Sequence, residues 1–253
     1  STHTSYLKML AVAGVPTFVE KPISEEYFQI KNFLGSFKNN GGLKVQVGFN
    51  LRYLPIIGVI SKYLTEGKLG KILYADLYVG QYLPSWRLEG SYADSYSASF
   101  SEGGGVSLDL IHELDLAYCW FGNVNFNEIF SAKLSKLKID CEDFVRFETK
   151  LKPVVRVTLD YLNHVKSRRY ILVGDAGSIE CDVVFGRFKY VSYKGRETVL
   201  DDPKLFDLKA TYTFEIDDFL YQIKKGGKFD TSERALGLDC LKTALKGRKH
   251  LQK

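Results

Sequence analysis

The sequence predicts an α/β (α+β) chain in two parts: a short parallel sheet, then an open, mainly antiparallel sheet with helices packed on one face. Two observations support this. Helix and strand patterns alternate through residues 4–49, as they do where crossover helices join parallel strands. Through residues 126–193, strand patterns follow one another directly, as in antiparallel sheets. We therefore expect one part over 1–50 and a second over 51–253.

The first part is expected to hold two helix–strand pairs. Pro22 should stop the first strand, and Ser24 before two glutamates is a typical helix start. A run of Asn and Gly then ends the second helix. The expected elements are a helix over 4–14, a strand over Thr17–Val19, a helix over Glu25–Phe37 and a strand over Lys44–Phe49.

The second part begins with a helix over Pro55–Thr65 and a strand over Lys71–Gln81. The stretch Tyr82–Gly103 is rich in Ser, Tyr and Gly, and unstructured loops of this length are usually functional. A helix over 107–121 follows. Alternating apolar and polar residues then predict strands over 126–133, 144–151, 155–161, 169–173, 178–182 and 187–193. Apolar residues at helical spacing predict two final helices, one around 216–223 and one that begins at Thr231.

The composition is that of a folded protein with a moderate positive charge. Of 253 residues 45% are hydrophobic, and 17 Phe and 16 Tyr outnumber 6 Pro, which argues against disorder. The formal net charge is +5, and the basic residues are scattered. Two short basic clusters lack interleaved aromatics, so we interpret them as solvated surface and expect no nucleic-acid partner: Lys166, Arg168 and Arg169, and Lys246, Arg248 and Lys249.

The spacing of the cysteines and the length of the apolar segments indicate in which compartment the protein is expected. No CxxC pair occurs, so we expect buried free thiols in a cytoplasmic protein. Leu7–Val15 has a short apolar core without a basic segment before it, which disfavours a secretory signal. No run reaches membrane-spanning length, and we expect no membrane partner. The four cysteines are Cys119, Cys141, Cys181 and Cys240.

A carboxylate and an imidazole occur together after a glycine run. Asp109 and His112 are three residues apart, which on one helix places them on one face, where the carboxylate can raise the basicity of the imidazole. The glycines Gly103–Gly105 allow a close backbone approach. The alternative is a buried, satisfied histidine with an acid favoured by the helix dipole. We expect no metal site, because no second His or Cys cluster has ligand spacing, and no phosphate loop, because the Lys-Ser/Thr ending is missing.

A lysine and a Trp–Arg pair are further candidates for binding. Lys21 directly follows a predicted parallel strand, whose carboxyl end should face a ligand crevice. There it can donate a hydrogen bond to a substrate oxygen; the alternative is a surface lysine before a proline. In the long loop, Tyr82, Trp86 and Arg87 offer an apolar wall and a fork for carboxylate or phosphate. The alternative there is a loop anchored by Trp86.

Taken in order, these motifs resemble the glucose–fructose oxidoreductase, inositol dehydrogenase and MocA (Gfo/Idh/MocA) family of NAD(P)-dependent oxidoreductases. The resemblance covers nearly the whole chain, and its most specific feature is the combination of E-K-P with G-G-G…D…H. The matching segments are Ser1-Thr2-His3-Thr4, Val19-Glu20-Lys21-Pro22, Gly48-Phe49-Asn50-Leu51-Arg52-Tyr53-Leu54-Pro55, the loop Gly80–Arg87 with Ser95–Ala98, Gly103–Gly105 with Asp109, His112 and Asp115, and Gly174–Ser178.

The resemblance implies hydride transfer between a nicotinamide, of NAD or NADP, and a carbinol carbon of a sugar, nucleotide sugar or cyclic polyol. His112 would be the general acid/base, Lys21 would position or share the proton, and Asp109 would bind substrate. Contacts to the cofactor would come from Thr2, His3, Glu20, Lys21 and Pro22. Contacts to the substrate would come from Asn50, Arg52, Tyr82, Trp86, Arg87, Asp109 and His112.

The chain departs from this family pattern at its beginning. No GxGxxG motif occurs, so residues 1–50 are expected to be the C-terminal remnant of a dinucleotide-binding Rossmann domain, and 51–253 a substrate-binding and dimerisation domain. The 253 residues alone are then expected to be inactive, the activity belonging to the intact parent. The alternative function is a non-catalytic dimerisation or sugar-binding module. Family likeness further implies a homodimer or homotetramer formed through the open sheet.

Overall fold

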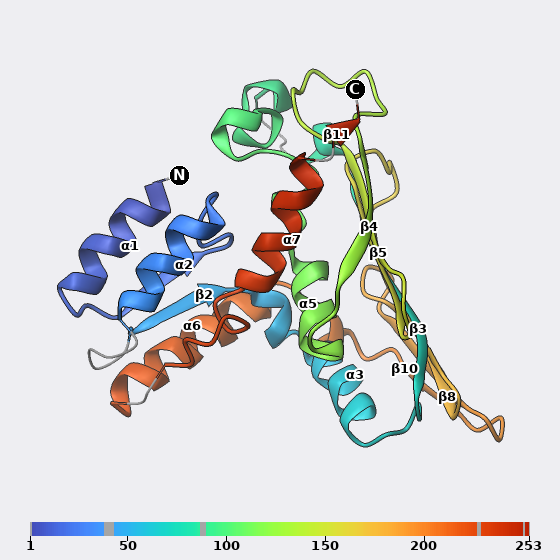
Figure 1. The fold of residues 1–253 in the computed structure, drawn as a ribbon. Coiled ribbons are helices and arrows are strands. Elements are labelled where there is room, and N and C mark those ends of the chain that lie inside the picture. The colour runs from blue at the N-terminus through green and yellow to red at the C-terminus, as the bar shows by residue number, and fades with distance from the viewer. Residues whose placement is uncertain (1, 38–42, 87–89, 227–228, 250, 253) are drawn as a thin grey trace.

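A computed structural model describes residues 2–37, 43–86, 90–226, 229–249 and 251–252 (Figure 1). The first part forms a two-stranded parallel sheet in which Glu20 lies opposite Gly48. Helix α6, from much later in the chain, also packs here, because its Phe219 contacts Phe18 with ring centroids 5.7 Å apart. The elements are α1 (Thr2–Val12), β1 (Thr17–Glu20), α2 (Tyr27–Ser36), β2 (Val45–Gly48) and α6 (Ala210–Lys224).

The second part is built on a large mixed sheet in the order β10-β9-β8-β7-β3-β6-β5-β4-β11. Most neighbours are antiparallel, but β3 runs parallel to β6 and β11 runs parallel to β4. The strands are β3 (Ile72–Gly80), β4 (Phe126–Ala132), β5 (Phe144–Thr149), β6 (Val154–Asp160), β7 (Ser167–Gly174), β8 (Gly177–Asp182), β9 (Arg187–Ser192), β10 (Glu197–Leu200) and β11 (Leu251–Gln252).

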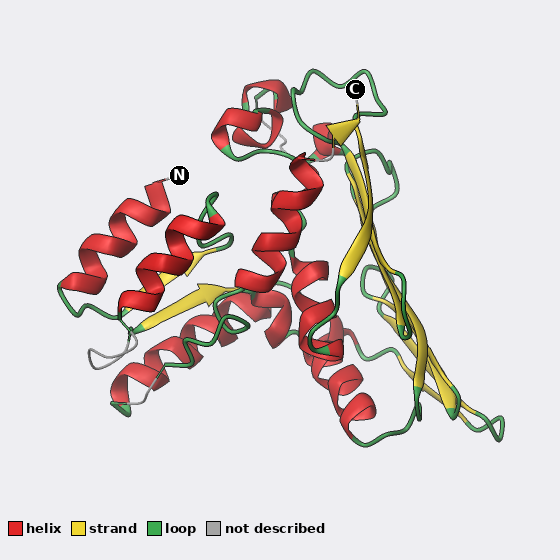
Figure 2. Cartoon of the chain, in the orientation of Figure 1, coloured by secondary structure: helices red, strands yellow, loops and turns green. Residues whose placement is uncertain are grey.

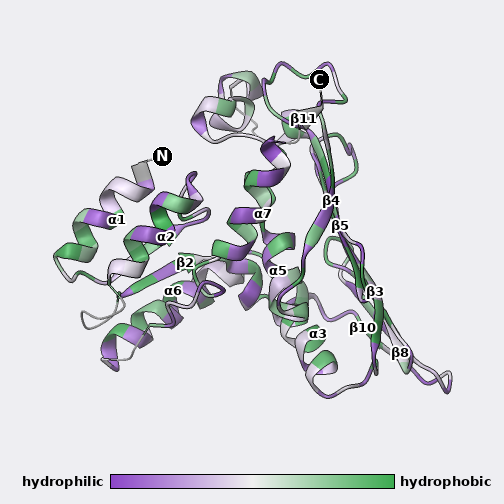
Figure 3. Cartoon of the chain, in the orientation of Figure 1, coloured by the Kyte–Doolittle hydropathy of each residue, from purple (hydrophilic) through white to green (hydrophobic). Residues whose placement is uncertain are grey.

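Helices cover one face of this sheet and leave the other open (Figures 1 and 2). They are α3 (Pro55–Thr65), α4 (Val106–Asp109), α5 (His112–Phe121) and α7 (Leu238–Lys249). Side chains on the covered face, such as Leu77, Phe147 and Val157, are fully buried, because alternate residues of a strand point to opposite faces. Figure 3 shows that α7 carries both hydrophobic and hydrophilic residues, as expected for a helix with one face against the sheet. The predicted fold class is confirmed.

The helix predicted over 107–121 is in fact two helices, because the chain leaves helical geometry at Leu110 (φ −101°, ψ 29°). In one continuous helix the carbonyl of Asp109 would accept the N–H of Glu113. Here that carbonyl accepts a hydrogen bond from Lys21 Nζ instead. The prediction of a single helix was therefore wrong, and the break opens a main-chain acceptor to the first part of the chain.

Three other predictions differ from the structure. The last helix begins at Leu238 rather than Thr231, since Gly237 has φ +67°, which a helix cannot accommodate. The long loop contains short 3₁₀ turns, the first at Leu83–Ser85 and the last at Phe100–Glu102. Strands β10 and β11 were not predicted. No helix within the described residues is long and apolar enough to cross a membrane.

Candidate functional site

Lys21 joins the two parts of the chain at the carboxyl end of β1. Its Nζ donates to the main-chain oxygen of Asp109 at 2.6 Å and reaches that of Leu108 at 3.5 Å. Burial lowers the pKa of Lys21, while the nearby charges of Asp109 and Glu20 act in the opposite direction. The ammonium group is therefore held at the end of the parallel strands, where ligand crevices form in such sheets.

A cavity of about 760 Å³ opens beside Lys21, at the meeting point of the two parts. Of the predicted cofactor contacts, the structure brings His3, Glu20, Lys21 and Pro22 together here, with His3 Nδ1 3.1 Å from the carbonyl oxygen of Pro22. Thr2 begins α1, but its side chain lies outside the described structure. The full lining is His3, Ser5, Glu20, Lys21, Pro22, Glu25, Tyr96, Ser101, Glu102, Gly103 and Asp109.

Asp109 lines the same cavity and is fixed by a tyrosine that sequence reasoning missed. The carboxylate is 7% exposed and accepts a 2.6 Å hydrogen bond from the hydroxyl of Tyr161. Burial and the charge of Asp109 raise the pKa of Tyr161 well above 10, so the phenol stays a donor. In the sequence Tyr161 ends the strand predicted over 155–161 and was not among the candidate site residues. The available signal was its hydroxyl, which needs a partner when buried.

His112 begins α5 and is neutral at ordinary pH. Burial lowers its pKa well below 6.5, and the positive charges of Lys21, Arg168 and Arg52 lower it further. The ring packs edge-on against Phe49, and its buried Nδ1 has no hydrogen-bond partner among the described residues. The expectation that Asp109 raises the basicity of this imidazole was therefore wrong. The histidine does not belong to the lining of the Lys21 cavity.

Arg52 and Asn50 are engaged within the protein. Arg52 donates from Nε and Nη2 to the two carboxylate oxygens of Asp115, at 2.8 and 2.5 Å, and its guanidinium lies over Phe49. Asn50 donates to the hydroxyl of Thr211 at 2.9 Å. Neither residue lines the Lys21 cavity. Both support the site's framework in this structure, and a direct substrate contact stays a prediction.

The predicted substrate loop lies beside the Asp109–Tyr161 pair. Trp86 meets Tyr161 edge-on with centroids 5.3 Å apart, and its Nε1 donates to the carbonyl of Gln81 at 3.3 Å. Tyr82 lies against the ring of His164, with centroids 3.9 Å apart. Arg87 is outside the described residues. Trp86 thus acts as a loop anchor here, and its contact with Tyr161 places it next to the site.

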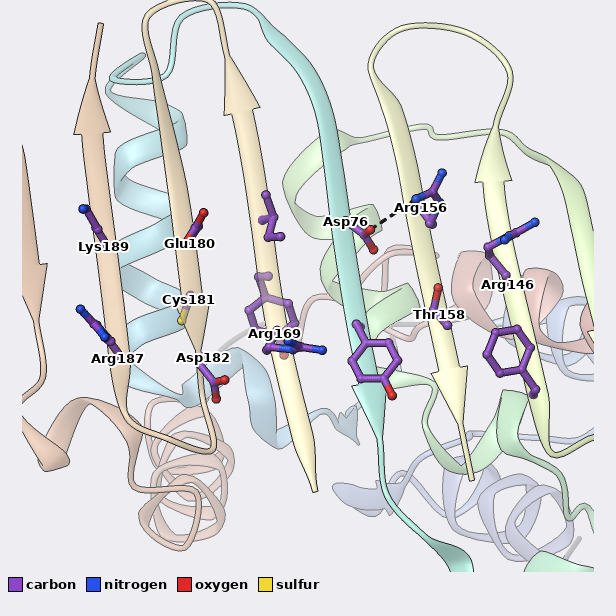
Figure 4. A pocket seen from close by; sticks show the side chains of 14 residues that line it. Asp76, Arg146, Arg156, Thr158, Arg169, Glu180, Cys181, Asp182, Arg187 and Lys189 are labelled. Atoms are coloured by element: carbon purple, nitrogen blue, oxygen red, sulfur yellow. Dashed lines mark hydrogen bonds and ion pairs between the residues drawn. The ribbon is translucent and has the colours of Figure 1, made fainter. Parts of the chain in front are cut away.

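Arg168 is a second residue that sequence reasoning missed, since it was interpreted as solvated surface. Its side chain is 14% exposed, and its Nε donates to Glu113 Oε1 at 2.7 Å. The hydroxyl of Tyr170 donates to the same oxygen at 3.0 Å. Arg168 and Arg169 are equally polar in sequence, but alternation along β7 sends them to opposite faces of the sheet. Only Arg169 faces the open side (Figure 4).

Glu215 on α6 is a buried carboxyl next to the Glu20 side of the site. It is 2% exposed, and its Oε1 has no hydrogen-bond partner among the described residues. Burial, with the charge of Glu20, raises its pKa from 4.5 to about 7. The carboxyl group therefore keeps a proton in the folded state that the unfolded state releases.

We expect Glu215→Gln to remove a pH dependence of stability. Between pH 4.5 and about 7 the folded protein binds more protons at this group, so its contribution falls as pH rises and is smallest above about 7. The shift in the pKa of Glu215 corresponds to a change of at most about 3 kcal/mol in the free energy of unfolding. Urea denaturation at about pH 5 and about pH 8 should show the variant relatively more stable at the higher pH. The exposed Glu26→Gln serves as control, and an identical pH response in both variants would contradict the assignment.

Three comparisons place the chain among known proteins. A family model described as "Oxidoreductase family, C-terminal alpha/beta domain" (GFO_IDH_MocA_C) matches residues 61–229. Inositol 2-dehydrogenase/D-chiro-inositol 3-dehydrogenase of Lactiplantibacillus plantarum is 25% identical over 233 residues, which are 88% of this chain and 62% of that protein. The chain thus spans less than two thirds of that relative's length.

Two solved structures show the same fold at low sequence identity. Levoglucosan dehydrogenase in complex with NADH and levoglucosan superposes with a TM-score of 0.78 at 20% identity, covering 98% of this chain and 75% of the other. An oxidoreductase from Agrobacterium radiobacter in complex with NAD⁺, L-tartaric acid and magnesium superposes with a TM-score of 0.78 at 18% sequence identity. The superposition covers 98% of this chain and 74% of the other. With a family model that matches most of its length, the chain belongs to the Gfo/Idh/MocA oxidoreductase family.

Proposed function

We propose that this chain forms the substrate side of an NAD(P)-dependent oxidoreductase, which moves hydride between a nicotinamide and a hydroxyl-bearing carbon of a sugar, nucleotide sugar or cyclic polyol. The observation that carries the proposal is the hydrogen bond from Lys21 at the end of β1 to the main chain of Asp109. It brings a lysine from the first part and a carboxylate from the second to one cavity, with a neutral imidazole close by.

The three groups have distinct roles in this proposal. The neutral His112 accepts the proton of the substrate hydroxyl during oxidation and returns it during reduction. Lys21 donates a hydrogen bond to the same oxygen and stabilises the developing alkoxide. Asp109, oriented by Tyr161, accepts a hydrogen bond from a neighbouring substrate hydroxyl. All three are buried or half-buried, and in a site of low dielectric their hydrogen bonds to a substrate are stronger than in water.

The residues around Lys21 fit the nicotinamide–ribose end of a dinucleotide. Glu20, Pro22 and His3 line the cavity directly after β1, where main-chain and carboxylate oxygens can accept from ribose hydroxyls. The cofactor, when bound, supplies the hydride acceptor or donor. Because the sequence holds no GxGxxG, we propose that the 253 residues alone bind NADH weakly and turn over little. A micromolar dissociation constant for NADH would contradict this.

The function is tested with the longest gene product that contains these residues. Cyclic polyols, aldoses and nucleotide sugars are offered with NAD⁺ and NADP⁺, and formation of the reduced nicotinamide is followed by its absorbance. The expected result is turnover with at least one class, lost in Lys21→Met. Sugar binding without any reduced nicotinamide would favour the sugar-binding alternative. A cytoplasmic location stays a prediction from the sequence; all four cysteines are free in the structure.

The open face of the large sheet supports a further part of the proposal, pairing with a second copy of the chain. The face holds a hollow of about 730 Å³, lined by acidic and basic side chains on neighbouring strands (Figure 4). Arg156, for example, lies 3.5 Å from Asp76 and 2.9 Å from Glu148. Because the face carries both signs of charge around an apolar Ile171, an identical face can complement it. We propose a homodimer, or a homotetramer, on this basis.

We expect Ile171→Asp to shift the oligomer toward monomer. Ile171 is 38% exposed and lines the hollow of the open face, and a carboxylate there would have to be desolvated on pairing. Light scattering with size exclusion gives the mass of wild type and variant at matched concentration. Phe185→Asp is the control, since Phe185 is 72% exposed outside the residues that line this hollow. A monomeric wild type would count against pairing.

A further inference from the structure

Arg168 has an incompletely used guanidinium beside the proposed reaction site. An arginine facing a carboxylate commonly uses two parallel N–H donors, one for each oxygen. Arg168 uses Nε alone, on Glu113 Oε1, and its two Nη groups make no hydrogen bond with any described residue. Glu113 is fully buried, and its own Oε2 has no partner in the described structure. The ion pair therefore leaves guanidinium donors unoccupied.

Of the other two cations around the imidazole, Arg52 is engaged within the protein, and Lys21 is the group assigned to the substrate hydroxyl. Arg52, Lys21 and Arg168 are the positive charges that act on His112. Arg52 satisfies both oxygens of Asp115 and also donates to two main-chain carbonyls. Lys21 is held on the carbonyl of Asp109. Among the three, Arg168 is the guanidinium whose Nη groups make no hydrogen bond with any described residue, and 14% of its side chain is exposed.

The residues around Arg168 fix its guanidinium within the protein. Its partner Glu113 follows His112 directly on α5, so the guanidinium is tied to the same short helix as the imidazole. Tyr170, two residues along β7, shares Glu113 Oε1 and is fully buried. A guanidinium fixed in this way loses little side-chain entropy when it binds a planar anion. The arrangement is that of a preformed recognition group rather than a mobile surface arginine.

We propose that Arg168 determines substrate specificity by binding an anionic oxygen group, a carboxylate or a phosphate, on the substrate. This inference rests on the proposed function and names its substrate class: acidic sugars, such as uronates, or phosphorylated ones, in preference to neutral polyols. The Nη donors match the two oxygens of such a group. Glu113 holds the guanidinium, and His112 and Lys21 are left for the carbinol.

The test compares ligands that differ by charge alone. The 253-residue chain is titrated with D-glucuronate and with its uncharged isostere D-glucuronamide, and binding is followed by calorimetry. A hydrogen bond to a charged group is worth about tenfold or more in affinity, so glucuronate should bind at least about tenfold more tightly. The preference should disappear in Arg168→Gln and shrink in Arg168→Lys, which keeps the charge but not the fork. Glucose 6-phosphate in place of glucuronate separates a phosphate site from a carboxylate site.

Matched variants keep the proposal falsifiable. Arg169→Gln changes the adjacent arginine on the opposite face and should leave the preference intact. If Arg168→Gln fails to fold because Glu113 is left unpaired, the double variant Glu113→Gln/Arg168→Met removes both buried charges and gives the same readout. Equal binding of the two ligands to wild type, or a preserved preference without Arg168, overturns the proposal. Turnover of neutral polyols that is indifferent to Arg168 would also overturn it while leaving the oxidoreductase function standing.

Discussion

The His112→Gln variant is expected to fold normally and to lose most of its hydride-transfer activity. Removal of a general acid/base costs about 10²- to 10⁴-fold in rate, and we expect kcat to fall by that amount with little change in KM. Glutamine keeps much of the ring's volume and polarity against Phe49 but cannot take up a proton. The measurement is steady-state turnover of the longest gene product, with thermal melting to confirm the fold.

The pH profile gives this prediction a second readout. Because burial and nearby positive charge hold the pKa of His112 well below 6.5, the imidazole is the free base at neutral pH. Oxidation should therefore be independent of this group from neutral pH upward and should decline at acid pH as the imidazole takes up a proton. Cys119→Ser, on the exposed side of the same helix, should retain both rate and profile. Unchanged turnover in His112→Gln would refute the assignment.

Sequence patterns predicted the elements of this fold where burial follows a simple period. In β6, Val155, Val157 and Leu159 alternate with polar residues, and all three are fully buried on the helix-covered face. Such strands can be recognised because side-chain period and burial coincide. The same reasoning cannot see contacts between distant segments. Phe219 of α6 packs against Phe18 of β1 although the two residues are about two hundred positions apart, and no local sequence pattern predicts this contact.

The most specific sequence motifs predicted which residues belong to the site, but they did not predict how these residues contact one another. Lys21 and Asp109 were expected to act together and do meet in one cavity. The carbonyl exposed by the break after Asp109 binds a lysine eighty-eight residues away in sequence, a contact that helical periodicity could not reveal. Arg168 is as polar as its neighbour Arg169, and its role follows from its place on the covered face of β7 and its pairing with Glu113. Buried polar residues of this kind are identified by their partners, which sequence alone does not supply.

The largest structural effect is expected at Gly104, where the loop crosses the start of α4. A Cβ at this position would overlap the carbonyl oxygen of Tyr96 and lie 2.7 Å from that of Ser99. Both are main-chain atoms, and Ser99 O already accepts the N–H of Gly104 at 2.8 Å. Neither neighbour can move aside as a side chain could. We expect Gly104→Ala to destabilise the fold by about 3 kcal/mol, the upper range for overpacking.

The matched control is Gly58→Ala. Gly58 lies on the exposed face of α3, and a methyl group added there would have no neighbouring atom within 4 Å, so alanine should stabilise the helix by about 0.5–1 kcal/mol. Urea denaturation of both variants should therefore give changes of opposite sign. Since Gly104 lies two residues before the helical turn α4 that carries Asp109, displacement of the loop should also weaken substrate binding by the molecules that remain folded. A Gly104→Ala protein as stable as wild type would show that the loop does not hold α4 as the structure indicates.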